Sequence, residues 1–116
     1  MTEASPIVSH RVTSWVEASF VGWHDAPFAQ RLHAHWWRVR LHYRRNPVDD
    51  GRKILADLRQ ALAQLHQQGL ADTLGMNATN EGIALWLVTA LAPLDPVKIE
   101  VWRDADHLGA ILEVLP

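Results

Sequence analysis

The sharpest chemical feature of the chain is a pair of histidines separated by one residue, His33-Ala34-His35. Residues two apart on a β-strand project from the same face, so two imidazoles at this spacing can chelate one metal ion. His24, nine residues before His33, can supply a third nitrogen. Three neutral imidazoles with one open position are typical of catalytic zinc. The spacing by itself does not require a metal, because a histidine pair at this spacing can also be exposed on a strand or hydrogen-bonded in the core.

Composition narrows the chemistry that this chain can support. Its 116 residues include no cysteine, which excludes disulfides, thiolate nucleophiles and sulfur-ligated metals. A formal net charge of −2 gives no electrostatic drive toward phosphate backbones, so we expect no nucleic-acid partner. The first ten residues lack the apolar core of a signal peptide, and no apolar run approaches the roughly 20 residues of a membrane span. These features predict one cytoplasmic domain over residues 1–116 without a membrane segment.

Two long alternating segments must position the histidines. Alternation of polar and apolar residues predicts one strand over residues 11–20 and a second over residues 32–45. Segment 22–31 contains Gly, Asp and Pro, and is predicted to be a loop with His24 in or beside it. One face of the second strand carries Arg38, Arg40, His42 and Arg44. That face is interpreted either as the lining of a barrel that attracts anions or as a solvated basic edge.

The middle of the chain has the periodicity of two helices. Apolar residues at helical spacing predict a first helix that begins after residues 49–51 and ends near Gly69. Thr79 is predicted to cap a second helix that ends before Pro93. Strand alternation returns at residues 97–103 and 110–114, with a turn between them. The order ββααββ predicts an α+β fold, a four-stranded antiparallel sheet with two helices on one face.

Four segments of the chain resemble one enzyme family. Residues 20–24 (FVGWH) and 31–39 (RLHAHWWRV) resemble the zinc-binding F-x-A-A-H and L-H-G-H-x-Y-R-V segments of the pyruvoyl- and carboxy-tetrahydropterin synthases. Residues 51–58 (GRKILADL) are similar to that family's G-M-V-x-D-F-x-x-L-K helix start, and residues 78–86 (ATNEGIALW) to its P-T-x-E-N-x-A-x-W. The likeness covers most of the chain, in order.

The resemblance implies a tunnelling fold, in which small subunits assemble into a barrel, usually a hexamer. It also implies zinc bound by His24, His33 and His35. The activity it implies is that of a lyase acting on a small pterin-like, or other heterocyclic or carbonyl, substrate. Thr79 and Glu81 match the family's ligand-contacting T-x-E. Without a ligand, the same two residues serve as a helix cap and an acid in the first turn.

The chain departs from the family pattern where the reacting groups stand. Ala29 occupies the place of the usual cysteine, and the family's Asp-His pair falls on residues 70–75, where only Asp72 remains. Arg103 stands where the family has the glutamate that anchors the pterin ring. Because arginine only donates hydrogen bonds, Arg103 predicts recognition of a carboxylate or phosphate instead. Asp72 is then the candidate catalytic residue, and Thr79, Glu81 and Arg103 are candidate substrate contacts.

Three functions therefore stay open at the level of sequence. The first is a zinc enzyme with a substrate different from that of its relatives and with Asp25, Asp72, Glu81 or His107 as proton carriers. The second is a conventional carboxytetrahydropterin synthase in which a carboxylate such as Asp25 replaces the cysteine. The third is a non-catalytic ligand-binding or assembly protein, whose tryptophans serve packing and subunit contacts. The remaining histidines, His10, His66 and His107, are predicted to be surface residues.

Overall fold

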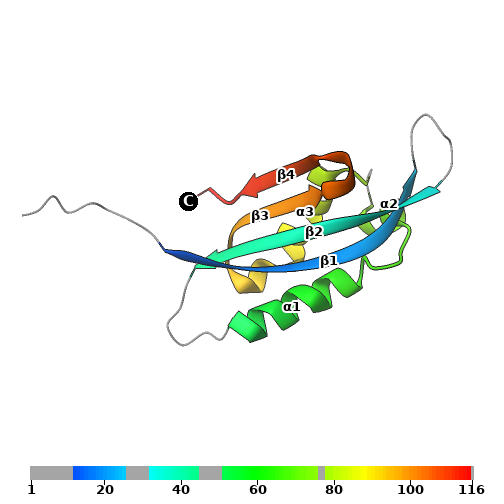
Figure 1. Cartoon of the computed structure of the whole chain (residues 1–116). Coiled ribbons are helices and arrows are strands. Elements are labelled where there is room, and N and C mark those ends of the chain that lie inside the picture. Colours follow the sequence, from blue (N-terminus) through cyan, green and yellow to red (C-terminus); the bar gives the residue numbers. More distant parts are fainter. Residues whose placement is uncertain (1–11, 26–31, 45–50, 76–77, 116) are drawn as a thin grey trace, which may run out of the picture.

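The computed structural model describes residues 12–25, 32–44, 51–75 and 78–115 of the chain. The elements, in order, are β1 (Thr13–Asp25), β2 (Leu32–Arg44), α1 (Gly51–Ala63), α2 (Leu70–Leu74), α3 (Asn80–Ala90), the short 3₁₀ turn η1 (Ala92–Leu94), β3 (Pro96–Arg103), the 3₁₀ turn η2 (Asp104–Asp106) and β4 (Leu108–Glu113). Figure 1 shows this arrangement. The predicted order of two strands, helices and two strands is confirmed, and α2 is an addition to it.

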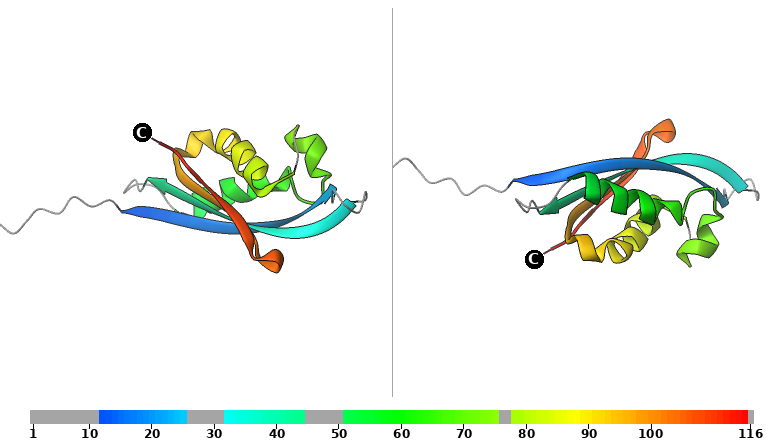
Figure 2. Two further views of the ribbon diagram at one scale, coloured as in Figure 1. Left: turned by 90° about the horizontal axis from the view of Figure 1, so that it is seen from above. Right: turned by 90° about the horizontal axis from the view of Figure 1, so that it is seen from below.

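The strands form one sheet in the order β1-β2-β3-β4, with every neighbouring pair antiparallel. Helices α1 and α3 lie on one face of this sheet, here called the covered face (Figure 2). Along β2 the alternation puts Trp37, Val39 and Leu41 on the covered face, where all three are buried. Their neighbours Trp36, Arg38 and Arg40 belong to the opposite, open face. The described part of the chain therefore has two layers, as the sequence predicts.

The core lies between the sheet and the two longer helices. The Trp37 ring stacks on Phe20 with ring centres 5.5 Å apart, and its Nε1 donates a hydrogen bond of 2.8 Å to Asn80 Oδ1. A buried tryptophan needs such a partner for its N–H, and this bond ties α3 to β2. The helices contribute their predicted apolar stripes, buried at Ile54, Leu58, Ala61, Leu62, Ile83 and Leu87. None of the helices within the described ranges has both the length and the apolar character that crossing a membrane requires.

The first helix ends earlier than the sequence predicts. Helix α1 stops at Ala63 and not near Gly69. Gln67 has a left-handed backbone, with φ of 57°, and its N–H donates to the Val21 carbonyl at 2.7 Å. Trp23 in turn donates its N–H to the Gln68 carbonyl at 2.9 Å. Bonding to the outer edge of β1 thus replaces the last helical turn and leads into α2.

Strand β1 is longer than predicted, since it continues through Gly22 to Asp25. The glycine is not a turn signal here. A Cβ atom built on Gly22 would lie 2.8 Å from Leu70 Cδ1, which is closer than real Cβ contacts allow. A glycine inside a strand marks this kind of close approach. His24 consequently belongs to the end of β1, beside the predicted loop and not within it.

Candidate functional site

The end of the β1–β2 hairpin brings the three predicted zinc ligands to neighbouring register positions. His24 pairs directly with His33, and His35 pairs with Gly22 two positions further along. Residues that face each other in an antiparallel pair share one face of the sheet, with Cβ atoms roughly 5 Å apart. The backbone therefore assigns positions 24, 33 and 35 to the same face.

The side chains of His24 and His33 lie outside the described part of the structure, so convergence of three imidazoles stays a prediction. Among the described side chains, no group of three or more histidine, aspartate or glutamate residues is placed to hold a metal ion. The predicted trio is a different case, because two of its three side chains lie outside the described residues. Ala29 and the Asp25 side chain also lie outside the described residues.

His35, the described member of the trio, sits beside the turn η2. Its ring makes an edge contact with Trp37 at 5.8 Å, and its Nδ1 lies 3.9 Å from Asp106 Oδ2. The same carboxylate oxygen lies 2.5 Å from the Nε of Arg103. That nitrogen is buried, and its contact with Asp106 is an ion pair without the alignment of a hydrogen bond. Sequence reasoning predicted His35 and Arg103, but missed the Asp106 carboxylate that joins them.

A cavity of about 240 Å³ lies against His35. It exists because β3 pairs with β2 only from Arg38 to Tyr43, which leaves residues 32–37 of β2 paired with β1 alone. The cavity is lined by Ser19, Ala34, His35, Trp36, Trp37, Arg38, Asp104 and Ala105. Because Trp37 is fully buried and Trp36 is exposed, the lining offers one accessible indole ring, one imidazole and one arginine–aspartate pair, which suit a small molecule with a flat face and polar edges. Of these residues, only His35 was a predicted site residue.

Thr79 and Glu81, two of the other predicted site residues, have structural roles in α3. Thr79 caps α3, because its Oγ1 accepts a hydrogen bond of 2.9 Å from the Gly82 N–H. Glu81 is exposed in the first turn of α3, where an acid is favoured by the helix dipole.

Asp72 is exposed on the five-residue helix α2. The bonding of β1 to residues 67–69 brings α2 to the same end of the hairpin as His24. Ligand contact or proton transfer by Asp72, Thr79 and Glu81 stays a prediction.

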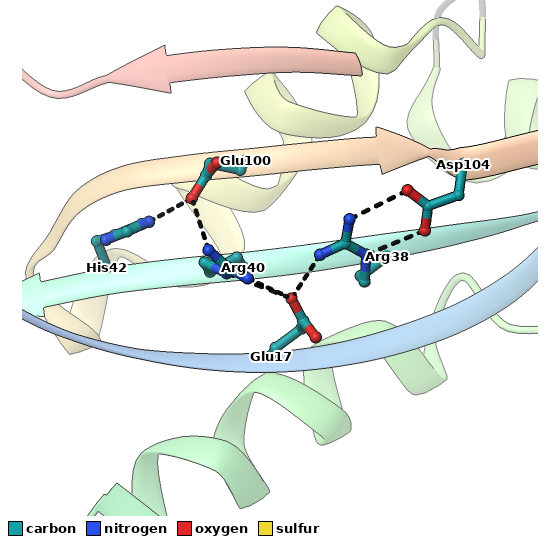
Figure 3. A network of polar contacts seen from close by, with 6 residues as sticks. All are labelled: Glu17, Arg38, Arg40, His42, Glu100 and Asp104. Carbon is teal, nitrogen blue, oxygen red and sulfur yellow. Dashed lines mark hydrogen bonds and ion pairs between the residues drawn. The ribbon is translucent and has the colours of Figure 1, made fainter. Parts of the chain in front are cut away.

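Three of the basic residues on the open face of β2, Arg38, Arg40 and His42, are paired with acids from three elements (Figure 3), whereas Arg44 is exposed. Asp104 accepts two hydrogen bonds of 3.0 Å from Arg38, and Glu17 accepts one of 2.9 Å from the same guanidinium. These bonds, from Asp104 first and Glu17 second, raise the pKa of Arg38 above its ordinary value. The bond from Arg38 lowers the pKa of Asp104 below its ordinary value.

The network continues toward the other end of β2. Glu17 Oε1 also accepts a hydrogen bond of 3.1 Å from Arg40 Nη2, and Glu100 Oε2 lies 2.5 Å from His42 Nε2. Burial of Glu100 by itself raises the pKa of this carboxyl, but the His42 bond and the charges of His42, Arg40 and Lys98 outweigh it, so the pKa is lowered. Charges therefore alternate in sign across three strands. Arg38, Arg40 and His42 form neither a free basic lining nor a simply solvated edge.

The two described histidines outside the predicted site have different surroundings. His66 is half-buried, and its Nδ1 accepts a hydrogen bond of 3.2 Å from the Val21 N–H, a partner that is not visible in the sequence. Its ring also lies 6.1 Å from that of Trp36. His107 is exposed as predicted, and its left-handed backbone, with φ of 56°, closes η2. His10 lies outside the described residues.

Comparison with known proteins identifies no family for this chain. No protein-family model matches it, and no curated protein matches it. Among solved structures, it is similar to the archaeosine synthase QueF-Like in the apo form, at 14% sequence identity and a TM-score of 0.49, over 89% of this chain and 97% of that one. A likeness at this level carries no argument about fold or function. The α+β class and the strand order rest on the chain's own elements.

Proposed function

We propose that this chain is a zinc-binding protein of the tetrahydropterin-synthase kind, with one ion bound by His24, His33 and His35. The observation that supports this most is the register of the β1–β2 hairpin, which pairs position 24 with position 33 and sets position 35 on the same face. The nitrogen-only donor set fits zinc, and a chain without cysteine offers no thiolate to close the site. The lack of cysteine is also compatible with the reducing cytoplasm that we propose as its location.

We propose a lyase-type reaction on a small pterin-like, or other heterocyclic or carbonyl, substrate. A zinc ion with three imidazole ligands polarises a carbonyl group or lowers the pKa of a bound water molecule. The cavity beside His35 is the proposed substrate site, in which the exposed indole of Trp36 supplies a flat apolar wall. Asp72 as proton carrier, and Thr79, Glu81 and Arg103 as substrate contacts, are proposed from the resemblance alone.

The chain is also proposed to act as a homo-oligomer, a hexamer if it follows its relatives. In the described chain, β1 and β4 are the two outer strands of the sheet. Edge strands with unpaired backbone groups are ready templates for another strand. On the open face, Trp15 and Trp36 are 52% and 62% exposed, and large exposed aromatic groups are enriched at subunit contacts.

A non-catalytic ligand-binding or assembly protein is the alternative. It is favoured by alanine at position 29, where the resembled family has its cysteine, and by the exposed tryptophans. Both functions keep the histidine site, so metal binding alone does not separate them. Turnover of pterin-like compounds by the zinc-loaded protein supports the enzyme, and tight binding of such compounds without turnover supports the alternative.

Metal analysis of the purified protein tests the zinc proposal directly. We expect one zinc ion per chain in the wild type and loss of that ion in His33→Ala and His35→Ala. His10→Ala is the matched control, because it removes a histidine outside the predicted trio and should keep the ion. Equal zinc content in all four proteins, or a wild type that takes up no zinc when the metal is supplied in excess, would contradict the proposal.

A further inference from the structure

The turn η2 carries two acids that have different partners on β2. Asp104 binds Arg38, which belongs to the open face, whereas Asp106 faces His35, which shares a face with Trp37. The turn itself is fixed at its end, where the His107 N–H donates to the Asp104 carbonyl at 3.1 Å. Asp104 and Asp106 therefore have separate partners, and a substitution at one serves as a control for the same substitution at the other.

The Asp106 carboxylate is held in place by Arg103. Its Oδ2 lies 2.5 Å from Arg103 Nε and 3.9 Å from His35 Nδ1, so one oxygen faces both groups. The Arg103 side chain is only 18% exposed and the Asp106 side chain is 38% exposed. An enclosed guanidinium thus fixes a carboxylate that remains reachable from the histidine side.

We propose that Asp106 is a positioning residue, which orients the imidazole of His35 for metal binding by accepting the ring N–H that points away from the ion. The inference rests on the proposed zinc site. A histidine that ligates zinc donates its second ring N–H to a carboxylate or carbonyl in most known sites, and this bond fixes the tautomer and strengthens the ligand. The separation of 3.9 Å exceeds a hydrogen bond of roughly 3 Å by about 1 Å. The proposal therefore requires the imidazole to turn toward Asp106 when the site is occupied.

Asp106 is assigned to orientation and not to direct ligation because of Arg103. The oxygen nearest His35 already lies against a guanidinium, which is a permanent cation. A zinc ion on the same oxygen would face that cation at short range, and like charges this close repel. A neutral imidazole N–H meets no such opposition and gains a charge-assisted hydrogen bond.

The test is a measurement of zinc affinity by chelator competition in the wild type, Asp106→Asn, Asp106→Glu and Asp104→Asn. We expect Asp106→Asn to bind zinc about 10- to 100-fold more weakly, the usual cost of losing the carboxylate partner of a ligating histidine. Asp106→Glu should recover part of the loss because it keeps the charge. Asp104→Asn, which removes the same charge from the same turn, should bind zinc as the wild type does. Circular dichroism of each variant confirms that all are folded.

A cobalt(II) spectrum supplies the readout that separates orientation from ligation. The visible bands of Asp106→Asn should keep the tetrahedral positions of the wild type, because the ligand set is unchanged. Loss of those bands would show Asp106 to be a ligand and overturn the positioning role. Equal zinc affinity of Asp106→Asn and Asp104→Asn would overturn it while leaving the zinc proposal intact. A wild type without zinc would overturn both, so the two failures are distinguishable.

Arg103 gives an independent check. Arg103→Gln should weaken zinc binding less than Asp106→Asn does, and should add no further loss in the Asp106→Asn background, because Arg103 acts through that carboxylate. Such non-additivity is the signature of two residues that work as one unit. Fully additive losses would show that Arg103 acts on the site separately and would contradict the arrangement.

Discussion

Trp36 and Trp37 are neighbours on β2 with identical side chains and opposite environments. Trp37 is fully buried on the covered face, whereas Trp36 is 62% exposed on the open face. The contrast extends along the strand, since apolar residues follow Trp37 and ion-paired residues follow Trp36. The open face carries more charged residues than the covered face, but Arg38, Arg40 and His42 are paired there with acidic residues. The end of the β1–β2 hairpin is the better candidate for a functional site, because His35 lies there beside a cavity and the Asp106 carboxylate.

Replacing the two tryptophans in turn tests the contrast most strongly. Trp37→Ala should lower the free energy of unfolding by about 3–5 kcal/mol, since it leaves a large cavity and strands the Asn80 amide. Trp36→Ala should cost less than about 1 kcal/mol in the isolated chain. Urea denaturation at low protein concentration measures both. Equal losses would contradict the two-faced description, and a Trp36→Ala loss that grows with concentration would show a partner on the open face.

Substitution of Glu100 tests how much the paired charges of the open face contribute to stability. Glu100→Gln keeps the shape of the side chain but removes the charge that His42 and Arg40 face, and should cost about 2 kcal/mol. Glu113→Gln makes the same substitution on the exposed part of the same face and should change stability by less than about 0.5 kcal/mol. Both are measured from urea midpoints at pH 7. A Glu100→Gln variant as stable as Glu113→Gln would show that the paired charges contribute nothing.

Acid should weaken the network by a smaller amount. The pKa values of Glu100 and Asp104 are lowered on folding, so their stabilisation is complete above the ordinary values of 4.5 and 3.8 and is lost as the pH falls through the folded values. Stability should therefore decline below about pH 4.5, and the decline should be shallower in Glu100→Gln. Urea midpoints between pH 6 and pH 3 measure it. Parallel profiles for the two proteins would refute the role given to Glu100.

Local pattern was enough for most of the architecture. Alternation assigned the faces of β2 correctly, and helical spacing found the stripes that include Leu58 and Leu87. Thr79 was identified as a cap because capping depends on residues only three apart. Predictions failed where a distant segment decides the outcome. Gly22 suggested a turn, but Leu70 packs against it and the strand continues.

The site shows the same division between local and distant information. The spacing of His33 and His35 is readable from sequence, because two residues on one strand share a face. The contact between His35 and Asp106 joins positions 71 residues apart and depends on where β3 ends. Likewise, the sequence left Arg38 either in a barrel lining that attracts anions or on a solvated edge, because neither Glu17 nor Asp104 is near it in the sequence. These contacts between residues distant in the sequence follow from the pairing of the strands and cannot be inferred from residue spacing.

The close approach of Gly22 and Leu70 constrains how this protein can change over evolutionary time. Leucine occupies the space that any larger residue at position 22 would need, with Cδ1, Cδ2 and Cγ all within 2.9 Å of the missing Cβ. A larger residue at position 22 requires the Leu70 side chain to move away or to be replaced by a smaller one. Substitutions at these two sites should therefore tend to be inherited together, a coupling between the β1–β2 hairpin and the segment that follows the first long helix.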